Sequence, residues 1–180
     1  MSAILIVHSS FDGQTERIAA RIAGVLRRSG HQVEVRPVDA HPSVSGFDAV
    51  IVGGAVRIGT YARALRTWAR EMEPALRMRP NAFFSVCLSA AGPRANLEEA
   101  QRCVDKFKAQ SDWEPHDTRI FGGALPYRRY NMALRLMMRF IVGRAGGDTD
   151  TSRDYEYTDW DAVEGFARGF ARRVALVHAA

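Results

Sequence analysis

Short runs of apolar residues recur along the chain and are separated by segments of helix length. Most of these runs are apolar at nearly every position, which is typical of strands that are covered on both faces. We therefore predict five parallel strands, at residues 4–7, 33–38, 49–52, 82–88 and 120–125.

The intervening segments carry apolar residues at helical spacing, which predicts helices around 18–26, 61–72, 97–107 and 163–174. Parallel strands need crossover connections, and these crossovers cover both faces of a sheet. The alternation therefore predicts an α/β fold, a doubly wound five-stranded parallel sheet with helices on both faces. Ligands of such sheets bind at the carboxyl ends of the strands, where we expect 9–15, 53–61 and 89–96 to converge.

The opening segment, 3–16, reads as a buried strand, a turn with hydroxyl groups and a glycine, and the start of a helix. Backbone N–H groups and the hydroxyls of Ser10 and Thr15 would gather at the positive end of the helix dipole, which favours a phosphate. The turn has neither the lysine of a P-loop nor three spaced glycines, so a terminal monophosphate fits best and FMN is the candidate. Taken alone, the segment is also compatible with a plain strand-to-helix turn.

A segment at about 126–146 separates the last strand from the last helix and predicts a basic amphipathic helix over 131–143. A helix of roughly 13–16 residues, against the ~20 that cross a bilayer, can lie on a membrane but cannot span it. Packing of its apolar face on its own domain is the alternative. The apolar face would hold Tyr130, Ala133, Leu134, Met137, Met138 and Ile141, and the polar face Arg128, Asn131, Arg135 and Arg139.

The amino-acid composition limits the number of domains, the state of the cysteines and the class of partner. With 180 residues, 47% of them hydrophobic, the chain is long enough for one domain over 1–180. Two cysteines are too few for a disulfide framework and lack metal-ligand spacing, so we expect reduced thiols and no metal site. The chain enters a strand directly, without a signal segment, and we expect a cytoplasmic protein. A net charge of +5 favours an anionic partner without choosing among nucleic acid, lipid surface and polycarboxylate.

The opening loop resembles that of the flavodoxin-like superfamily, which has a hydroxyl residue, a glycine and a closing threonine at the spacing of Ser10, Gly13 and Thr15. Nearly the whole chain is similar to the menaquinone-dependent protoporphyrinogen IX dehydrogenases of haem biosynthesis, which are flavodoxin-like proteins with a characteristic insertion. The matching segments are 12–15, 57–61, 82–86, 122–127, 146–151 and 157–160.

This resemblance implies FMN-dependent oxidation of protoporphyrinogen IX to protoporphyrin IX, with electrons passed to menaquinone or ubiquinone. The chemistry belongs to the flavin, so no protein residue is named as catalytic. The implied flavin site comprises Ser10, Phe11, Asp12, Gly13, Gln14 and Thr15, then Arg57, Ile58, Gly59 and Tyr61, and finally Ser89, Ala90, Ala91, Gly92 and Asn96. Residues of the insertion implied to face substrate or membrane are Arg128, Arg129, Arg135, Met138 and Arg139.

The sequence differs from that of electron-carrier flavodoxins in two places, and each difference leads to an expectation about the site. Asp12 and Gln14 stand where those carriers usually have Thr and Asn, and a carboxylate would repel a phosphate. We therefore expect Asp12 to point outward or to cap the helix. Residues 89–94 supply no aromatic ring, so we expect at least one flavin face to be open to substrate. Arg57 and Arg94 would favour anionic reduced flavin or meet a substrate carboxylate.

For partners, we expect the arginines of the insertion to pair with the propionates of the substrate and to hold the protein on an anionic membrane, at the inner face of the cell membrane. We expect no nucleic acid partner, and a homo-oligomer is left open. Three alternatives remain. They are a flavodoxin-type electron shuttle, which tends to be acidic where this chain is basic, an NAD(P)H:quinone reductase, and a nucleic-acid or membrane-binding module that has lost its flavin.

Overall fold

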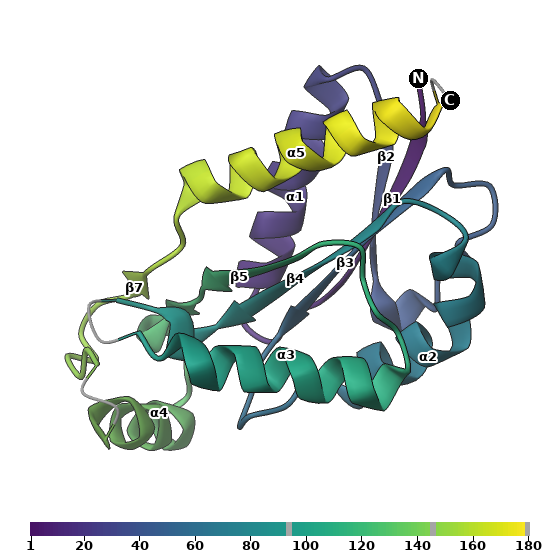
Figure 1. Ribbon diagram of the computed structural model, residues 1–180. Coiled ribbons are helices and arrows are strands. Elements are labelled where there is room, and N and C mark those ends of the chain that lie inside the picture. The colour runs from purple at the N-terminus through teal and green to yellow at the C-terminus, as the bar shows by residue number, and fades with distance from the viewer. Residues whose placement is uncertain (93–94, 145–146, 179–180) are drawn as a thin grey trace.

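The protein is described by a computed structural model that covers residues 1–92, 95–144 and 147–178 (Figure 1). Its main sheet has the strand order β2-β1-β3-β4-β5, and every neighbouring pair is parallel. The number, chain order and parallel pairing of the five predicted strands are thus confirmed. The strands are β1 (Ala3–Ser9), β2 (Gln32–Pro37), β3 (Ala49–Ala55), β4 (Asn81–Cys87) and β5 (Thr118–Gly122).

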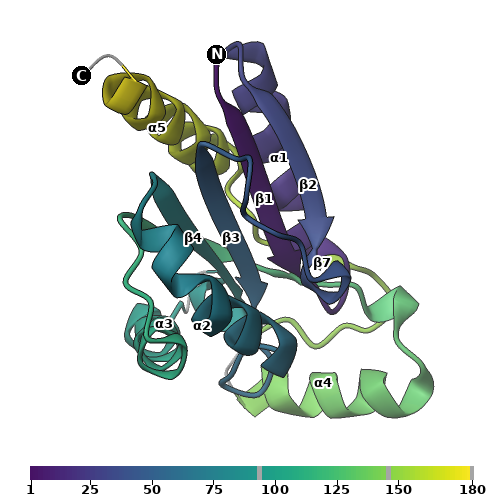
Figure 2. The same ribbon diagram turned by 90° about the vertical axis from the view of Figure 1, so that its right-hand side faces the viewer.

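Two helices cover each face of the sheet (Figures 1 and 2). One layer contains α1 (Gln14–Arg28) and α5 (Trp160–His178), and the other contains α2 (Arg63–Arg77) and α3 (Leu97–Ser111). Side chains alternate along β1, so that Ile4 and Ile6 join the core under α1 and α5 while Leu5 and Val7 join the core under α2 and α3. The predicted doubly wound architecture is therefore confirmed.

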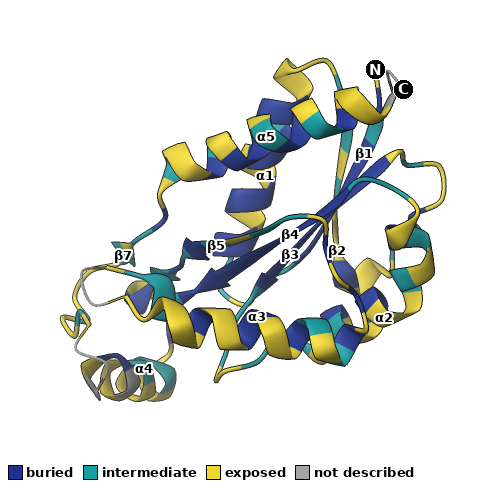
Figure 3. Ribbon diagram, in the orientation of Figure 1, coloured by how far each residue is buried: buried dark blue, intermediate teal, exposed yellow. Residues whose placement is uncertain are grey.

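The figure coloured by burial shows dark blue strands between helices whose outer sides are yellow (Figure 3). The edge strand β2 differs from the inner strands, because only Val33 and Val35 pack on the core and their neighbours are exposed. Among the inner strands, Gly53 of β3 has no room for a side chain. A Cβ atom there would lie 2.0 Å from Cζ of Phe84, so the aromatic ring occupies the space that glycine leaves.

The last predicted strand, at 120–125, is wrong in its second half. The main sheet ends at Gly122, and β6 (Ala124–Leu125) pairs antiparallel with β7 (Tyr155–Glu156). The return segment holds the chain in this place, because Thr158 Oγ1 donates to the carbonyl of Gly122 at 2.8 Å and Tyr157 N donates to the carbonyl of Gly123 at 3.0 Å. These contacts draw the chain out of the sheet towards the insertion.

The insertion contains a 3-10 turn, η3 (Tyr127–Arg129), and the helix α4 (Met132–Arg144). Two further 3-10 turns, η1 (Val38–Ala40) and η2 (Leu88–Ala90), follow β2 and β4. Asn131 caps α4, since its side-chain oxygen accepts from Leu134 N at 2.9 Å. In both views α4 lies at the end of the molecule where the strands of the sheet end, opposite the N-terminus (Figures 1 and 2).

The predicted face of α4 needs correction. Leu134, Met138 and Val142, spaced four residues apart, pack against buried Leu125, Tyr127 and Tyr130. Ala133 and Met137, expected on the same face, are exposed. The helix has more apolar positions than one stripe can bury, so a second apolar side faces outward with Met132, Leu136, Met137 and Phe140. Of Ile141, the backbone is described but not the side chain.

Candidate functional site

Three loops meet at the carboxyl ends of neighbouring strands β1, β3 and β4 (Figure 2). They are the segment between β1 and α1, the segment between β3 and α2, and the segment between β4 and α3. The strand order changes direction at β1, and crevices at such points are the usual ligand sites of doubly wound sheets. The predicted convergence of the three loops is therefore present.

The first loop leads into α1 without a side-chain cap. Gly13, with φ +88°, is the residue before the helix, and its N–H donates to Ser10 Oγ at 3.0 Å. Thr15 in the first turn is 1% exposed, and its Oγ1 is buried without a hydrogen-bond partner. A buried hydroxyl rarely stays unpaired, so Thr15 and the uncapped N–H groups beside it fit the oxygens of a phosphate.

The side chains of the two unusual loop residues turn away from this site. Asp12 does not cap the helix; its Oδ2 accepts a hydrogen bond from Tyr130 of the insertion at 3.2 Å. Gln14 Nε2 donates to Thr158 at 2.8 Å and to Glu156 at 3.1 Å. Gln14 thus has only its backbone N–H to offer a phosphate, and its side chain ties α1 to β7.

The second loop presents strained backbone and apolar surface. Residues 57–60 form a tight turn, with Arg57 N donating to Thr60 O at 2.8 Å and Thr60 N to Arg57 O at 3.2 Å. Its central residues, Ile58 and Gly59, have φ +50° and +67°. The left-handed region is unfavourable for a β-branched residue, and Ile58 is 83% exposed, so no packing explains its place there. Such strain is typical of ligand-contacting positions.

Arg57 lies over the ring of Phe11, with its guanidinium carbon 4.9 Å from the ring centroid. Phe11 itself is 40% exposed, so the first two loops together present two apolar side chains and one cation. Tyr61, by contrast, does not face the site. Its ring is buried against Phe83 and Phe107, and its hydroxyl donates to Ser85 at 2.7 Å. The buried ring leaves only the backbone of Tyr61 for the predicted contact with the cofactor, which stays a prediction.

The third loop starts in η2 and ends at the cap of α3. Ser89, Ala90 and Ala91 are partly exposed, and Gly92 has φ +70°. Asn96, expected at the flavin, uses its side-chain oxygen to accept from Glu99 N at 3.0 Å and therefore caps α3. The prediction for Arg94 falls outside the described residues, as does Pro93.

The arginines of the insertion have different surroundings. Arg135 is half-buried and donates to the carbonyls of Tyr127 at 3.0 Å and Tyr130 at 3.3 Å. It therefore supports the fold of the insertion and does not face a substrate or membrane as expected. Met138 is likewise packed inward. Arg128, Arg129 and Arg139 are exposed, and their contact with substrate or membrane stays a prediction.

A cluster of tyrosines, not expected from the sequence, joins the insertion to the site. The ring of Tyr127 packs edge-on against Tyr130 and Tyr155, and Tyr155 stacks on Tyr157. Tyr157 donates to the carboxylate of Asp148, and a Cβ on Gly92 would lie 3.6 Å from its ring. Four of the five tyrosines of the chain lie after residue 126. This clustering in the sequence is the one feature from which the tyrosine cluster could have been predicted.

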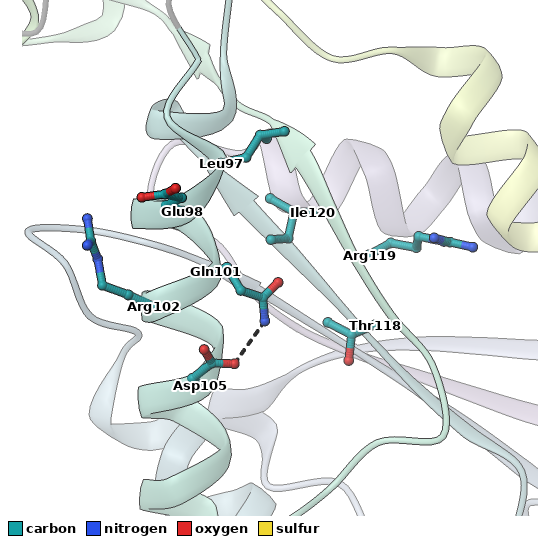
Figure 4. A pocket seen from close by; sticks show the side chains of 8 residues that line it. All are labelled: Leu97, Glu98, Gln101, Arg102, Asp105, Thr118, Arg119 and Ile120. Carbon is teal, nitrogen blue, oxygen red and sulfur yellow. Dashed lines mark hydrogen bonds between the residues drawn. The ribbon is translucent and has the colours of Figure 1, made fainter.

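The described residues also form an open groove between α3 and β5 (Figure 4). It runs along the free edge of β5, beside the sheet and not across its carboxyl ends. Within it, Gln101 donates to Asp105 at 2.8 Å. The described part of the chain contains no cluster of three or more potential metal ligands among its His, Cys, Asp and Glu residues.

Comparison with known proteins agrees with this geometry. The family model described as a flavodoxin domain matches residues 5–152. The chain belongs to the flavodoxin domain family. It is 36% identical over 169 residues to the protoporphyrinogen IX dehydrogenase (quinone) of Escherichia coli K12, covering 93% of each chain. It is 34% identical to the Leishmania major protein of the same name, covering 93% of this chain and 74% of that one.

Solved structures support the fold alone. Oxidised flavodoxin 1 from Bacillus cereus superposes with a TM-score of 0.57 at 17% identity, covering 95% of this chain and 98% of that one. A short-chain flavodoxin associated with a bacterial microcompartment gives a TM-score of 0.60 at 12% identity, covering 97% and 99%. The cofactor of this flavodoxin-like protein is a flavin, and the unpaired hydroxyl of Thr15 fits its phosphorylated form.

Proposed function

We propose that the protein is an FMN-dependent protoporphyrinogen IX dehydrogenase that passes electrons to a membrane quinone. The observation that carries this proposal is the 36% identity to a protein of that activity over 93% of the chain, a span that includes the insertion. An electron shuttle of the flavodoxin type would not need the exposed apolar side that α4 presents to solvent.

FMN fits the loops in two parts. The buried Thr15 hydroxyl, the Ser10 hydroxyl and the uncapped N–H groups of α1 would hold the phosphate. Ile58 and the segment 89–92 would flank the ring. When bound, the isoalloxazine would supply the redox chemistry, taking electrons from the porphyrinogen and passing them on to the quinone. The protein residues bind, orient and exclude water, and none of them is assigned a proton-transfer step.

Substrate and membrane would meet the protein on the same side. Arg57 and Arg139 are cationic groups at this end of the molecule and suit the two carboxylates of the substrate. The outward side of α4 presents Met132 and Leu136, 78% and 59% exposed, next to arginines. Such a surface favours peripheral binding to anionic lipid at the inner, cytoplasmic face of the cell membrane, where quinone is dissolved.

Anaerobic mixing of the FMN-loaded protein with protoporphyrinogen IX tests the activity. We expect flavin absorbance to bleach as porphyrin fluorescence grows, and a menaquinone analogue to restore the absorbance. NADH in place of the porphyrinogen is the control and should leave the flavin oxidised. A flavin that bleaches with NADH but not with the porphyrinogen would contradict the proposal and indicate an NAD(P)H:quinone reductase.

A further inference from the structure

Arg129 occupies an unexpected place between the insertion and the first loop. It is the last residue of η3, and its Nη1 lies 3.8 Å from where a Cβ on Gly13 would be. Gly13 precedes the uncapped first turn of α1. The side chain of Arg129 is exposed and makes no hydrogen bond or ion pair with the residues that the structure describes. A free guanidinium therefore lies beside the predicted phosphate loop.

The backbone around Arg129 is firmly held. Arg129 N donates to Pro126 O at 2.9 Å, and the neighbouring carbonyl of Tyr130 accepts from the half-buried Arg135. Tyr130 is 6% exposed and donates through its hydroxyl to Asp12 at 3.2 Å. The insertion is thus tied to the first loop at Asp12, and the segment of β7 is tied to the same loop by the contacts of Gln14 with Glu156 and Thr158.

Burial raises the pKa of the Tyr130 hydroxyl, and the neighbouring Asp12 carboxylate raises it further. With a raised pKa, the hydroxyl is protonated at neutral pH and donates to Asp12. The carboxylate of Asp12 is held by this bond away from the loop interior.

We propose that Arg129 pairs with the phosphate of FMN, so that the insertion supplies a cation at the phosphate end of the cofactor site. This inference rests on the proposed FMN dependence. The loop offers hydroxyls and N–H groups but no cation of its own, and it carries the negative charge of Asp12. A guanidinium beside Gly13 offsets that charge and can donate two parallel hydrogen bonds to a phosphate. The Tyr130–Asp12 contact is the positioning device that keeps Arg129 over the loop.

The test compares FMN with riboflavin, which has the same ring and lacks the phosphate. Apo protein is titrated into each flavin and the quenching of flavin fluorescence is followed, for wild type, R129Q and R139Q. Arg139 is the matched control, an exposed arginine of the same insertion. We expect wild type to prefer FMN, R129Q to bind FMN about tenfold more weakly with riboflavin affinity unchanged, and R139Q to match wild type for both.

Two further variants test whether the charge and the position of Arg129 determine the FMN affinity. R129K should recover part of the FMN affinity, because a lysine keeps the charge but not the paired donors. Y130F should lower FMN affinity by a smaller factor than R129Q, since it removes only the tether to Asp12.

The outcomes separate this inference from the proposed function. A wild type that prefers FMN, with R129Q unchanged, would overturn the role of Arg129 and leave the FMN proposal standing. An equal loss of both flavins in R129Q would also overturn it, because the effect would then be on the fold and not on the phosphate. A wild type that binds riboflavin as tightly as FMN would contradict the FMN proposal itself.

Discussion

Two residues at the cofactor end of the protein are in unfavourable states when no ligand is bound. Ile58 is the clearest case, because a β-branched side chain at φ +50° costs about 1–3 kcal/mol and its 83% exposure returns no burial in exchange. Thr15 has a buried hydroxyl without a partner. Both costs are offset when a ligand supplies the missing contact, which is the usual relation between local strain and a binding site.

Replacing Ile58 by asparagine should separate stability from binding. Asparagine tolerates the left-handed region, so I58N is expected to stabilise the apo protein by about 1 kcal/mol. The same change should weaken FMN binding several-fold, because the apolar contact to the ring is lost. Urea unfolding of the apo protein and fluorescence titration with FMN measure the two effects.

Gly59→Ala is the matched control for this prediction. Gly59 has φ +67°, and a Cβ there would meet no atom within 4 Å, so its only effect on the apo protein is backbone strain. We expect G59A to destabilise by about 1 kcal/mol. An I58N protein that is no more stable than wild type would show that the turn at 57–60 is not strained.

At the scale of elements, the contact between α1 and β7 holds the first loop in place. Gln14 and Arg17 both bond to Glu156, and Arg17 lies 3.1 Å from its carboxylate. Burial alone would raise the pKa of Glu156, but the hydrogen bonds from Gln14 and Arg17 outweigh it and lower that pKa below the ordinary 4.5. A depressed carboxylate pKa contributes stability above its unfolded-state value, and that contribution is lost as the pH falls through the folded value.

E156Q should therefore be less stable than wild type at pH 7 by about 0.5 kcal/mol, a small value because the side chain is 35% exposed. The difference should shrink as the pH is lowered below 4.5 and wild type loses the same contribution. Urea unfolding at several pH values measures this convergence. E34Q, which removes an exposed pair with Arg36, should change the stability at pH 7 by less than E156Q. A gap for E156Q that stays constant down to pH 3 would contradict the assignment.

The elements also show where sequence reasoning succeeds and where it stops. Long apolar runs such as those of β1 and β4 have enough positions to be recognised from their pattern alone. The strands β6 and β7 have two residues each, too few for a period, and their pairing depends on contacts across 30 residues of chain. The burial of the Tyr61 ring was not predicted, because its position in a loop does not reveal that the ring packs on Phe83 and Phe107.

In the insertion, the residues of α4 were read as one apolar stripe, although the helix has two apolar sides. Tyr127 and Tyr130 precede the helix in the sequence, and the inward side of α4 packs against them. These two residues therefore decide which side of the helix is buried. The pattern of the helix alone does not contain that information. In the first loop, likewise, the opening motif located Ser10, Gly13 and Thr15, but the partners of Asp12 and Gln14 come from the far end of the chain.

For the whole molecule, charge and exposed apolar surface are concentrated in one segment. Residues 126–146 contain five arginines and no acidic residue. The net charge of this segment therefore equals the net charge of the complete chain, +5. No helix of the described residues is long and apolar enough to cross a membrane. A basic segment with an outward apolar side combines the two forces that hold a helix at a lipid surface, burial of apolar area and attraction to anionic head groups.

Exposed apolar residues elsewhere allow a matched test of this surface. M132S/L136S removes two apolar side chains from the outward side of α4, and L176S/V177S removes two from the end of α5, where Leu176 and Val177 are 71% and 58% exposed. In a sedimentation assay with vesicles that contain phosphatidylglycerol, we expect the α4 variant to bind about tenfold more weakly than wild type. The α5 variant should bind like wild type.

Salt and lipid charge then separate the two forces in the same assay. Raising the ionic strength to 0.5 M, or using phosphatidylcholine vesicles, should weaken wild-type binding, because the arginines of the insertion then lose their attraction to the surface. FMN affinity should be the same in wild type and M132S/L136S, since both residues point away from the packed side of α4. Equal vesicle binding by the two double variants would mean that α4 does not insert its apolar side. Its exposed residues would then be free to contact the hydrophobic substrate directly.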